Sequence, residues 1–364
     1  MSDRVGFEID FLPVGNGERS GDAISIRYGS PGKYKVLVYD GGTKESGQAL
    51  VDHIRTYYGT TFVDYVVNSH PDGDHASGLS VVLEQLNVGT LWMHRPWNHS
   101  KEIRNYFKDG RITDNSLAER LKEGMSAAYK LEEIANANDI PIIEPFSGAA
   151  VGPFVVMSPQ KNWYVHDLIA EFQKSPAQKM EAFWESMLKG AQKKDADWIL
   201  ELWTGEETLR ENIDAKAENE SSVILLGVIA KHGIMLTGDA GIRALNAAIS
   251  ACESAKLSLP EFLNFCQMPH HGSRHNVSPS ILDRLLGSRK PSNDGITTKT
   301  AFVSAANGSS THPRSAVVNA FLRRGAKVIA TPDSAKRFHC KMPPRCGWRE
   351  AKSLAFSYAA EPWN

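Results

Sequence analysis

The amino-acid sequence predicts an α/β protein in which packed β-sheets carry helices on their outer faces. Short runs of β-branched and aromatic residues recur along the chain, and apolar positions at three- to four-residue spacing follow many of them. Glycine, proline and asparagine separate these segments. Since each sheet and each helix must bury one apolar face, this alternation indicates a sandwich of sheets beneath outer helices.

The individual elements follow from this periodicity. In the first part we expect strands at 5–11, 23–28, 34–39, 62–67 and 90–94, with helices at 48–57 and 79–86. Residues 142–144 and 154–157 are predicted to form a short β pair. The later part repeats the pattern, with strands at 222–230, 234–236, 263–268, 300–304 and 326–330 and helices at 242–250, 279–286 and 314–324.

Two segments depart from this alternation. Residues near 98–137 and 160–217 are polar, rich in alanine, lysine, glutamate and tryptophan, and apolar at helical spacing. We expect mostly helical insertions that lie over the core of a single domain spanning 1–364, because no linker-like composition separates them from it. Such insertions also offer a surface for a protein partner.

Bulk composition narrows the class of protein. The 364 residues include 41 Lys+Arg and 42 Asp+Glu, for a net charge of −1, which excludes a globally basic nucleic-acid binder but not a local basic patch. The longest apolar run, 223–230, is much shorter than the roughly 20 residues of a membrane-spanning helix. The four cysteines are too few for a disulfide scaffold, and the first residues lack a signal peptide's apolar region. We therefore expect a soluble, cytoplasmic protein that does not associate with membranes.

Potential metal ligands follow the strand predicted at 62–67. His70, Asp72, Asp74 and His75 place two imidazoles and two carboxylates within six residues. A Pro-Asp-Gly turn exposed to solvent would explain one carboxylate, but four donors on one loop favour a metal site. Similar loops follow two later strands: Asp239 comes after an apolar run, and His270 and His271 come after another. Together they predict one site for two metal ions at a sheet edge.

These motifs carry a family resemblance. The sequence SHPDGDHASG at 69–78 is similar to the HxHxDH signature of the metallo-β-lactamase superfamily, with Asp72 in place of the middle histidine. With LTGDA at 236–240 and PHHGS at 269–273, it resembles the metallo-β-lactamase domain of ComEC-type competence proteins. VGNG at 14–17, GDAI at 21–24 and VLVYDGG at 36–42 support this likeness. The resemblance covers about residues 5–335 and implies a four-layer αββα sandwich with helical insertions.

The resemblance also implies roles for individual residues. His70 and Asp72 resemble ligands of the first metal ion, whereas Asp74, His75 and either His270 or His271 resemble ligands of the second. Asp239 resembles the carboxylate that bridges the two ions, and Asp40 resembles the buried acid that supports the ligand loop.

Two features depart from the family pattern. Residues 18–20 are additional in the early glycine motif, and Asn219 stands where a third histidine motif is usual. His94, His99, His166 and His232 are alternatives for that missing histidine, although packing or surface roles are the simpler explanation.

The expected ligand set indicates a hydrolytic mechanism. Two divalent ions activate a water molecule and neutralise charge on the attacked phosphoryl or acyl oxygen. Asp74 is the candidate that orients this water or takes its proton, and His312 and Ser273 are candidates to hold a phosphate oxygen or protonate the leaving group. The many carboxylates favour manganese without excluding zinc.

The last part of the chain bears on the substrate. Residues 314–352 contain ten Lys/Arg against Asp333 and Glu350, a net charge of +8. This basic segment favours nucleic acid, preferably DNA, and hence a phosphodiesterase or nuclease. A solvated basic face is the alternative explanation. Two other functions remain open: hydrolysis of a small phosphoester, such as a phosphorylcholine-type headgroup or a nucleotide, or another ester, and a catalytically silent, metal-bound adaptor.

Overall fold

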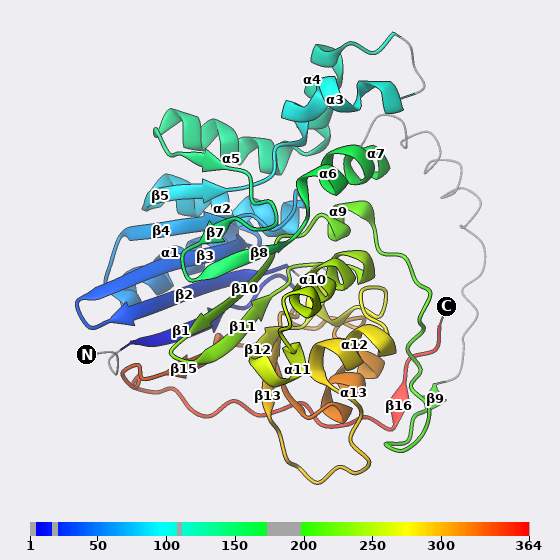
Figure 1. Cartoon of the computed structure of the whole chain (residues 1–364). Helices are drawn as coiled ribbons and strands as arrows, with labels where there is room; N and C mark the ends of the chain where they lie inside the picture. The colour runs from blue at the N-terminus through cyan, green and yellow to red at the C-terminus, as the bar shows by residue number, and fades with distance from the viewer. Residues whose placement is uncertain (1–4, 17–20, 108–110, 173–197, 364) are drawn as a thin grey trace.

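The computed structural model describes residues 5–16, 21–107, 111–172 and 198–363. Two seven-stranded sheets pack face to face, and helices cover their outer faces, which gives the expected α/β sandwich (Figure 1). Residues 18–20 of the early glycine motif and 173–197 of the second insertion lie outside the described residues. Within the described ranges, no helix combines the length and the apolar composition needed to cross a membrane.

Sheet 1 contains the N-terminal strands and one strand from the far end of the chain. Its spatial order is β15 (Lys336–Cys340), β1 (Gly6–Phe11), β2 (Ala23–Ser30), β3 (Lys33–Gly41), β4 (Phe62–Val67), β5 (Asn87–Trp92) and β6 (Ile142–Ile143). The pairs from β15 to β3 are antiparallel, and those from β3 to β6 are parallel.

Sheet 2 is built in the same way. Its order is β14 (Ala326–Ala330), β13 (Lys299–Val303), β12 (Leu263–Gln267), β11 (His232–Leu236), β10 (Ile224–Ile229), β8 (Phe154–Ser158) and β7 (Ala150–Val151). The four strands from β11 to β14 are parallel. Each sheet therefore has a parallel half whose strands all end at one edge.

Alternation of side chains along the strands separates the core into layers. On β3, Leu37 and Tyr39 pack between the sheets, whereas Val36 and Val38 pack beneath the outer helices. The helices on sheet 1 are α1 (Lys44–His53), extended by η2 (Ile54–Tyr58), α2 (Gly73–Gln85) and α5 (Ser126–Ala137). Those on sheet 2 are α10 (Ile242–Ser254), α12 (Pro279–Leu286) and α13 (Ser315–Arg323).

The insertions contain most of the remaining short helices. The first carries η3 (Pro96–His99), α3 (Ser100–Ile103), η4 (Arg104–Tyr106) and α4 (Asp114–Gly124), followed by α5. The second begins with α6 (Lys161–Trp163), η5 (Tyr164–Leu168) and α7 (Ile169–Glu171). Outside the insertions lie α9 (Ala217–Glu220), α11 (Leu259–Phe262) and η6 (Pro269–Gly272).

Two expectations about this region are wrong. The strands near 142 and 154 do not pair with each other, because β6 joins sheet 1 and β8 joins sheet 2, so that the chain crosses between the sheets here. Residues 198–216 are also not helical in the structure; they contain β9 (Ile199–Leu200), which pairs with β16 (Ala359–Ala360).

An ion-pair network fastens the last part of the chain to sheet 1. Glu8 and Asp10 on β1 are both fully buried. Arg345 donates to Glu8 Oε2 at 2.8 Å and to both carboxylate oxygens of Asp10 at 2.8 Å. Burial alone raises the pKa of Asp10, but His53 and Arg345 outweigh it and bring this pKa below its ordinary value. The C-terminal segment is thus part of the folded domain.

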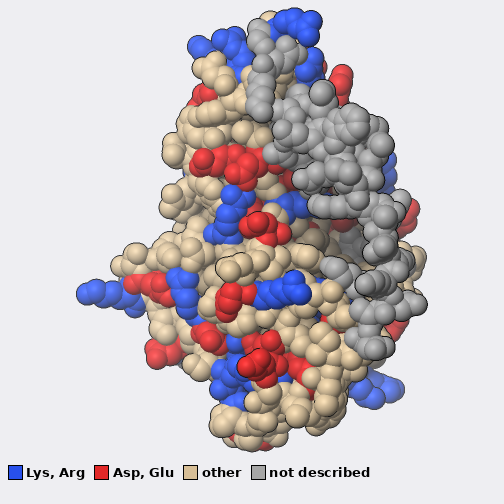
Figure 2. Space-filling view, turned by 90° about the vertical axis from the view of Figure 1, so that its right-hand side faces the viewer, with Lys and Arg blue, Asp and Glu red and all other residues tan. Residues whose placement is uncertain are grey.

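Ion pairs also correct the expectation of a basic surface over residues 314–352. Five of the ten cations in 314–352 form ion pairs. Four of them pair with acids outside this segment: Arg323 with Glu201, Arg324 with Glu207 and Asp283, Arg337 with Glu8, and Arg345 with Glu8 and Asp10; Lys327 pairs with Glu350 of the same segment. Arg323 and Arg324 are buried. On the face shown in Figure 2, basic and acidic side chains are intermixed. Charge counted along the sequence misses acids that only the fold brings near.

We predict that Arg345→Ala lowers the free energy of unfolding by about 3–5 kcal/mol, because it removes the arginine that pairs with the buried carboxylate of Asp10. Arg349→Ala, at an exposed position in the same segment, is the control and should change it by less than about 0.5 kcal/mol. Urea unfolding measures both. Equal effects in the two variants would contradict the network.

Because the pKa of Asp10 is lowered in the folded protein, the ionised carboxylate contributes to the free energy of unfolding. This contribution is present above the unfolded-state pKa and is lost as the pH falls through the folded-state pKa.

Candidate metal centre

The predicted ligands meet where the parallel strands of both sheets end. Asp40 lies at the end of β3, and His70 follows β4. Asp239 follows β11, and His270 follows β12. Two hydrogen bonds join the sheets at this edge, from Tyr39 Oη to the carbonyl of Val223 at 2.7 Å and from the Val223 N–H to the carbonyl of Ser69 at 3.0 Å. The carboxyl ends of parallel strands commonly carry the site in α/β proteins.

Helix α2 begins earlier than the sequence indicates, and this changes how the ligands are held. Asp72 is its N-cap, so Asp74 and His75 lie in its first turn rather than on a loop. A carboxylate in the first turn interacts favourably with the helix dipole. At Gly21, a Cβ atom would lie 2.0 Å from the carbonyl oxygen of Asp74, so only glycine allows this approach. Backbone packing therefore fixes the start of the helix.

The carboxylate of Asp239 is surrounded by imidazoles. Its Oδ2 atom lies 3.4 Å from His75 Nε2, 3.5 Å from His270 Nε2 and 3.8 Å from His70 Nε2. Its Oδ1 atom lies 3.7 Å from His271 Nε2. On the other side, His70 Nε2 is 3.8 Å from Asp72 Oδ2. Two atoms that bind one zinc ion at about 2.1 Å are roughly 3.4 Å apart in tetrahedral geometry, so these spacings suit a shared ion.

The buried polar atoms of the site indicate what it binds. Nε2 of His70, Nε2 of His75, both ring nitrogens of His271 and Oδ1 of Asp239 are buried without a hydrogen-bond partner. Such atoms are costly unless something satisfies them. Ligand atoms of Asp74, His75 and His271 lie within 4.8 Å of one another, as do those of Asp22, His75 and Asp239. These donors fit the divalent ions that the family resemblance implies.

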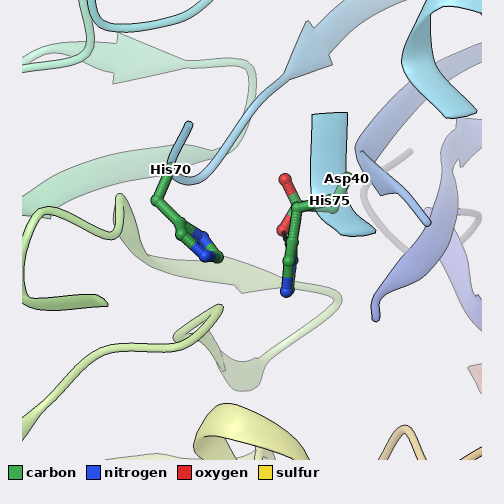
Figure 3. Close-up of side chains that lie close together, drawn as sticks. All are labelled: Asp40, His70 and His75. Carbon is green, nitrogen blue, oxygen red and sulfur yellow. Dashed lines mark hydrogen bonds and ion pairs between the residues drawn. The ribbon is translucent and has the colours of Figure 1, made fainter. Parts of the chain in front are cut away.

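Asp40 holds His75 in a ligating orientation. Its Oδ2 atom is 2.9 Å from His75 Nδ1 and accepts from Ser69 Oγ at 2.6 Å, and its Oδ1 atom accepts from the Ser69 N–H at 2.7 Å. Asp40 is fully buried and has a positive φ of 57°. Figure 3 shows the carboxylate beside His75, with His70 nearby. When Nδ1–H donates to Asp40, Nε2 keeps its lone pair for a metal ion.

Electrostatics divides the site into charged and neutral groups. Burial lowers the pKa of His75, but the charges of Asp239 and Asp40 outweigh it, so this pKa lies well above its ordinary value. Burial raises the pKa of Asp239, yet His75, His270 and His271 bring it well below its ordinary value. Burial lowers the pKa of His271 to about 3. His271 is therefore a neutral imidazole, the form that binds metal.

The tandem histidines have an unusual backbone. His270 and His271 have φ angles of 47° and 56°, a left-handed conformation that non-glycine residues rarely adopt and that often marks functional sites. His270 Nδ1 lies 2.7 Å from Asn276 Oδ1 and 3.1 Å from Asn219 Nδ2. Both rings direct Nε2 towards Asp239, so the structure brings both histidines to the site. Asn219, at the place of the missing histidine motif, contacts the Nδ1 side of His270, away from Asp239.

Two residues at the metal centre were not assigned a role in the sequence analysis. Asn276 positions His270 and also donates to the carbonyl of Asp239 at 2.7 Å. Asp22 lies 3.8 Å from His75 Nδ1, and burial raises its pKa to about 7, an effect that His75 opposes and Asp239 reinforces. The Gly-Asp pair at 21–22 was a sequence signal for Asp22, whereas Asn276 had none.

The other two candidate catalytic residues lie beside the cluster. The His312 ring stacks on that of His270, with centroids 6.1 Å apart. Ser273 follows the tandem histidines, and its Oγ accepts from the His275 N–H at 3.3 Å. The alternative histidines do not join the described metal groups: His94 stacks on Tyr164, and His232 packs against Phe7.

Part of the chain matches a known protein family. The family model of the metallo-beta-lactamase superfamily matches residues 17–146. Among solved structures, a metallo-beta-lactamase fold protein from Bacillus subtilis, YhfI, is 9% identical with a TM-score of 0.41, covering 92% of this chain and 100% of its own. MEM-A1, a subclass B3 metallo-beta-lactamase from a soil metagenome library, is 13% identical with a TM-score of 0.30, covering 76% of this chain and 85% of its own. No curated protein matches the sequence.

The fold and the donor cluster together define a class. The two helix-covered sheets are consistent with the metallo-β-lactamase fold, which the family model supports. The His/Asp groups at the sheet edge add candidate sites for divalent ions. These findings are consistent with a metal-binding protein of the metallo-β-lactamase fold, with the family match itself limited to residues 17–146.

We predict that Asp40→Asn weakens the binding of Mn²⁺ about 10- to 100-fold, because it removes the charge that orients His75. Titration calorimetry on chelator-treated protein measures the affinity. Asp52→Asn, at an exposed position on α1, is the matched control and should bind Mn²⁺ as the parent protein does. Unchanged affinity in a folded Asp40→Asn protein would show that Asp40 does not support the ligands.

Proposed function

We propose that the protein is a metal-dependent phosphodiesterase. The observation that carries the proposal is the buried cluster around Asp239, whose partnerless imidazole and carboxylate atoms face one another at a sheet edge. The cluster is rich in carboxylates, as the ComEC-type resemblance implies, and this favours manganese while also accommodating zinc.

The donors divide around Asp239 into two sets. His70, Asp72 and His270 would hold one ion, and Asp74, His75 and His271 would hold the other, with Asp239 shared between them. Bound divalent ions supply Lewis-acid stabilisation of charge on the phosphoryl oxygens and lower the pKa of a water molecule.

The chain's own residues then orient the reactants and handle protons. Asp74 carries the carboxylate that orients the attacking water and accepts its proton. Asp40 and Asn276 act as positioning residues, since they hold His75 and His270 through Nδ1. His312, stacked beside His270, is the candidate donor of a proton to the leaving oxygen, and Ser273 is a candidate donor to a phosphate oxygen.

A group of arginines beside the tandem histidines supports an anionic substrate. Arg274 and Arg210 lie over the Trp363 ring, with their guanidinium carbons 4.4 and 4.5 Å from its centroid. Burial lowers the pKa of Arg274, and the positive charges of Arg314 and Arg210 lower it further. Arg274 donates to the carbonyls of Glu361 and Pro362. Clustered like charges favour a bound anion such as a phosphoester.

We still propose nucleic acid as the substrate class, but we assign its binding to different residues from those that the sequence suggested. Arg323 and Arg324 are buried in ion pairs, so they do not contact a polyanion from the surface. Arg314 precedes α13 at the site and is partly exposed. The polynucleotide proposal therefore depends on Arg314 and its neighbours. A protein partner for the insertions stays a prediction from sequence.

Asp74→Asn should lower kcat for bis-p-nitrophenyl phosphate by roughly 10²–10⁴, since it removes the proposed proton acceptor. Elemental analysis must show the same Mn²⁺ content in variant and parent. Glu84→Gln, which removes an exposed carboxylate elsewhere on α2, is the control and should keep full activity. Full activity in a metal-loaded Asp74→Asn protein would contradict the assigned role.

Arg314→Gln should raise KM for single-stranded DNA and reduce the slope of log KM against log[KCl] by about 1, because one phosphate contact is lost. Steady-state kinetics at several KCl concentrations measures this slope. Arg349→Gln, at an exposed position remote in sequence from the ligand loops, is the control. If both variants keep the parent slope, the arginine group does not bind the polyanion.

A further inference from the structure

A cavity of about 390 Å³ lies beside the candidate metal centre. It is formed where β13 and β14 end, by the loop after β13, the start of α13 and residues 354–357. These strands belong to the same parallel half of sheet 2 as β11 and β12, which carry Asp239 and His270. The cavity and the metal ligands therefore share one edge of the sheet. Its volume is in the range of sites that bind small molecules.

The cavity is continuous with the metal centre through His312 and Pro313. His312 lines the cavity and stacks on His270, whose Nε2 is 3.5 Å from Asp239 Oδ2. Pro313, also in the lining, packs so closely on Gly272 that a Cβ there would lie 2.6 Å from Pro313 Cβ. The Arg314 N–H donates to the Gly272 carbonyl at 3.1 Å. A group bound in the cavity would thus be separated from the ligand loop by one imidazole.

The described part of the lining contains no lysine, arginine or carboxylate side chain and is mixed in polarity. Among the described residues that form it, none is Lys, Arg, Asp or Glu, and none is Phe, Tyr or Trp. Three serines, Ser309, Ser315 and Ser357, line it together with alanine, proline, valine and leucine residues. A second phosphate would find no lysine or arginine among these described residues. A quaternary ammonium group would find neither a carboxylate nor the aromatic face that such cations prefer.

The start of α13 is already occupied by a protein carboxylate. Glu361 Oε1 accepts from the Ser315 N–H at 2.9 Å, so this helix terminus is not left for an anionic ligand. The outer wall is held in place by Asn319, which is fully buried: its Nδ2 donates to the Ser357 carbonyl at 2.7 Å, and its Oδ1 accepts from the Ser357 N–H at 2.9 Å. The Leu354 N–H donates to the Val328 carbonyl at 2.8 Å. The cavity is therefore preformed.

We propose that this cavity receives an uncharged organic group of the phosphoester, of the size and mixed polarity of a nucleoside, while the phosphate lies at the metal centre. This inference rests on the proposed function and narrows its substrate class. It favours nucleotide-like substrates, in which sugar hydroxyls can bond to the serines and the base can pack on the apolar side. It disfavours phosphorylcholine-type headgroups.

Titration calorimetry with Mn²⁺-loaded protein tests the proposal with three phosphate monoesters that differ in the organic group. Thymidine 5′-monophosphate should bind at least about tenfold more tightly than methyl phosphate, since it buries additional apolar surface. Phosphorylcholine should bind no more tightly than methyl phosphate. Ala355→Phe, which adds bulk at an exposed position of the outer wall, should remove the advantage of thymidine 5′-monophosphate and leave methyl phosphate binding unchanged.

Ala137→Phe is the matched control, because Ala137 is an exposed alanine at the end of α5 and does not line the cavity. It should bind all three ligands as the parent does. Three results would overturn the proposal: equal affinity for thymidine 5′-monophosphate and methyl phosphate, tightest binding of phosphorylcholine, or equal weakening of all ligands by Ala355→Phe. Failure of the proposed function can be distinguished from failure of this inference. In that case the ligands would show the expected order of affinity, but the protein would not hydrolyse bis-p-nitrophenyl phosphate.

Discussion

The buried carboxylate of Asp239 is the group on which the site depends. It lies among four imidazoles, and both its lowered pKa and the raised pKa of His75 arise from their mutual attraction against the cost of burial. Asp40 and Asn276 fix two of these rings. The close approach of Gly21 to the Asp74 backbone fixes the start of α2, and that of Gly272 to Pro313 packs the tandem-histidine loop against the segment before α13. The sandwich thus holds polar atoms in an arrangement that only a bound cation fully satisfies.

In the proposed function, substrate recognition would be divided around this centre. Arginines beside the Ser273 loop would provide positive charge for a phosphoester, whereas the cavity beyond His312 has a partly apolar lining, whose described residues include no lysine, arginine or carboxylate side chain. The last residues of the chain contribute to both, because Trp363 lies against Arg274 and Arg210 while residues 354–357 form the cavity wall. The ion pairs of Arg345 and the pairing of β15 with β1 fasten the preceding segment to sheet 1. The C-terminal part therefore connects the stability of the fold to the proposed binding surface.

Sequence patterns predicted much of the fold but fewer of the residues that hold the metal ligands in place. Strands β4 and β14 and helix α12 have the expected bounds, because apolar runs bounded by turn residues leave few alternatives. Helix α2 begins six residues early, since its first turn is polar and is fixed by Gly21 and Asp72 rather than by an apolar face. Asn276 lies 37 residues from Asp239, to whose carbonyl it donates, and Glu201 lies 122 residues from Arg323, so no local pattern could reveal these contacts.

The most direct test of the metal centre is a crystal structure of the protein soaked with Mn²⁺, with anomalous diffraction measured above the manganese absorption edge. The account predicts anomalous peaks at ligand distance from Asp239, between His70 on one side and His75 and His271 on the other. Manganese bound elsewhere, with no peak beside Asp239 and these imidazoles, would contradict it.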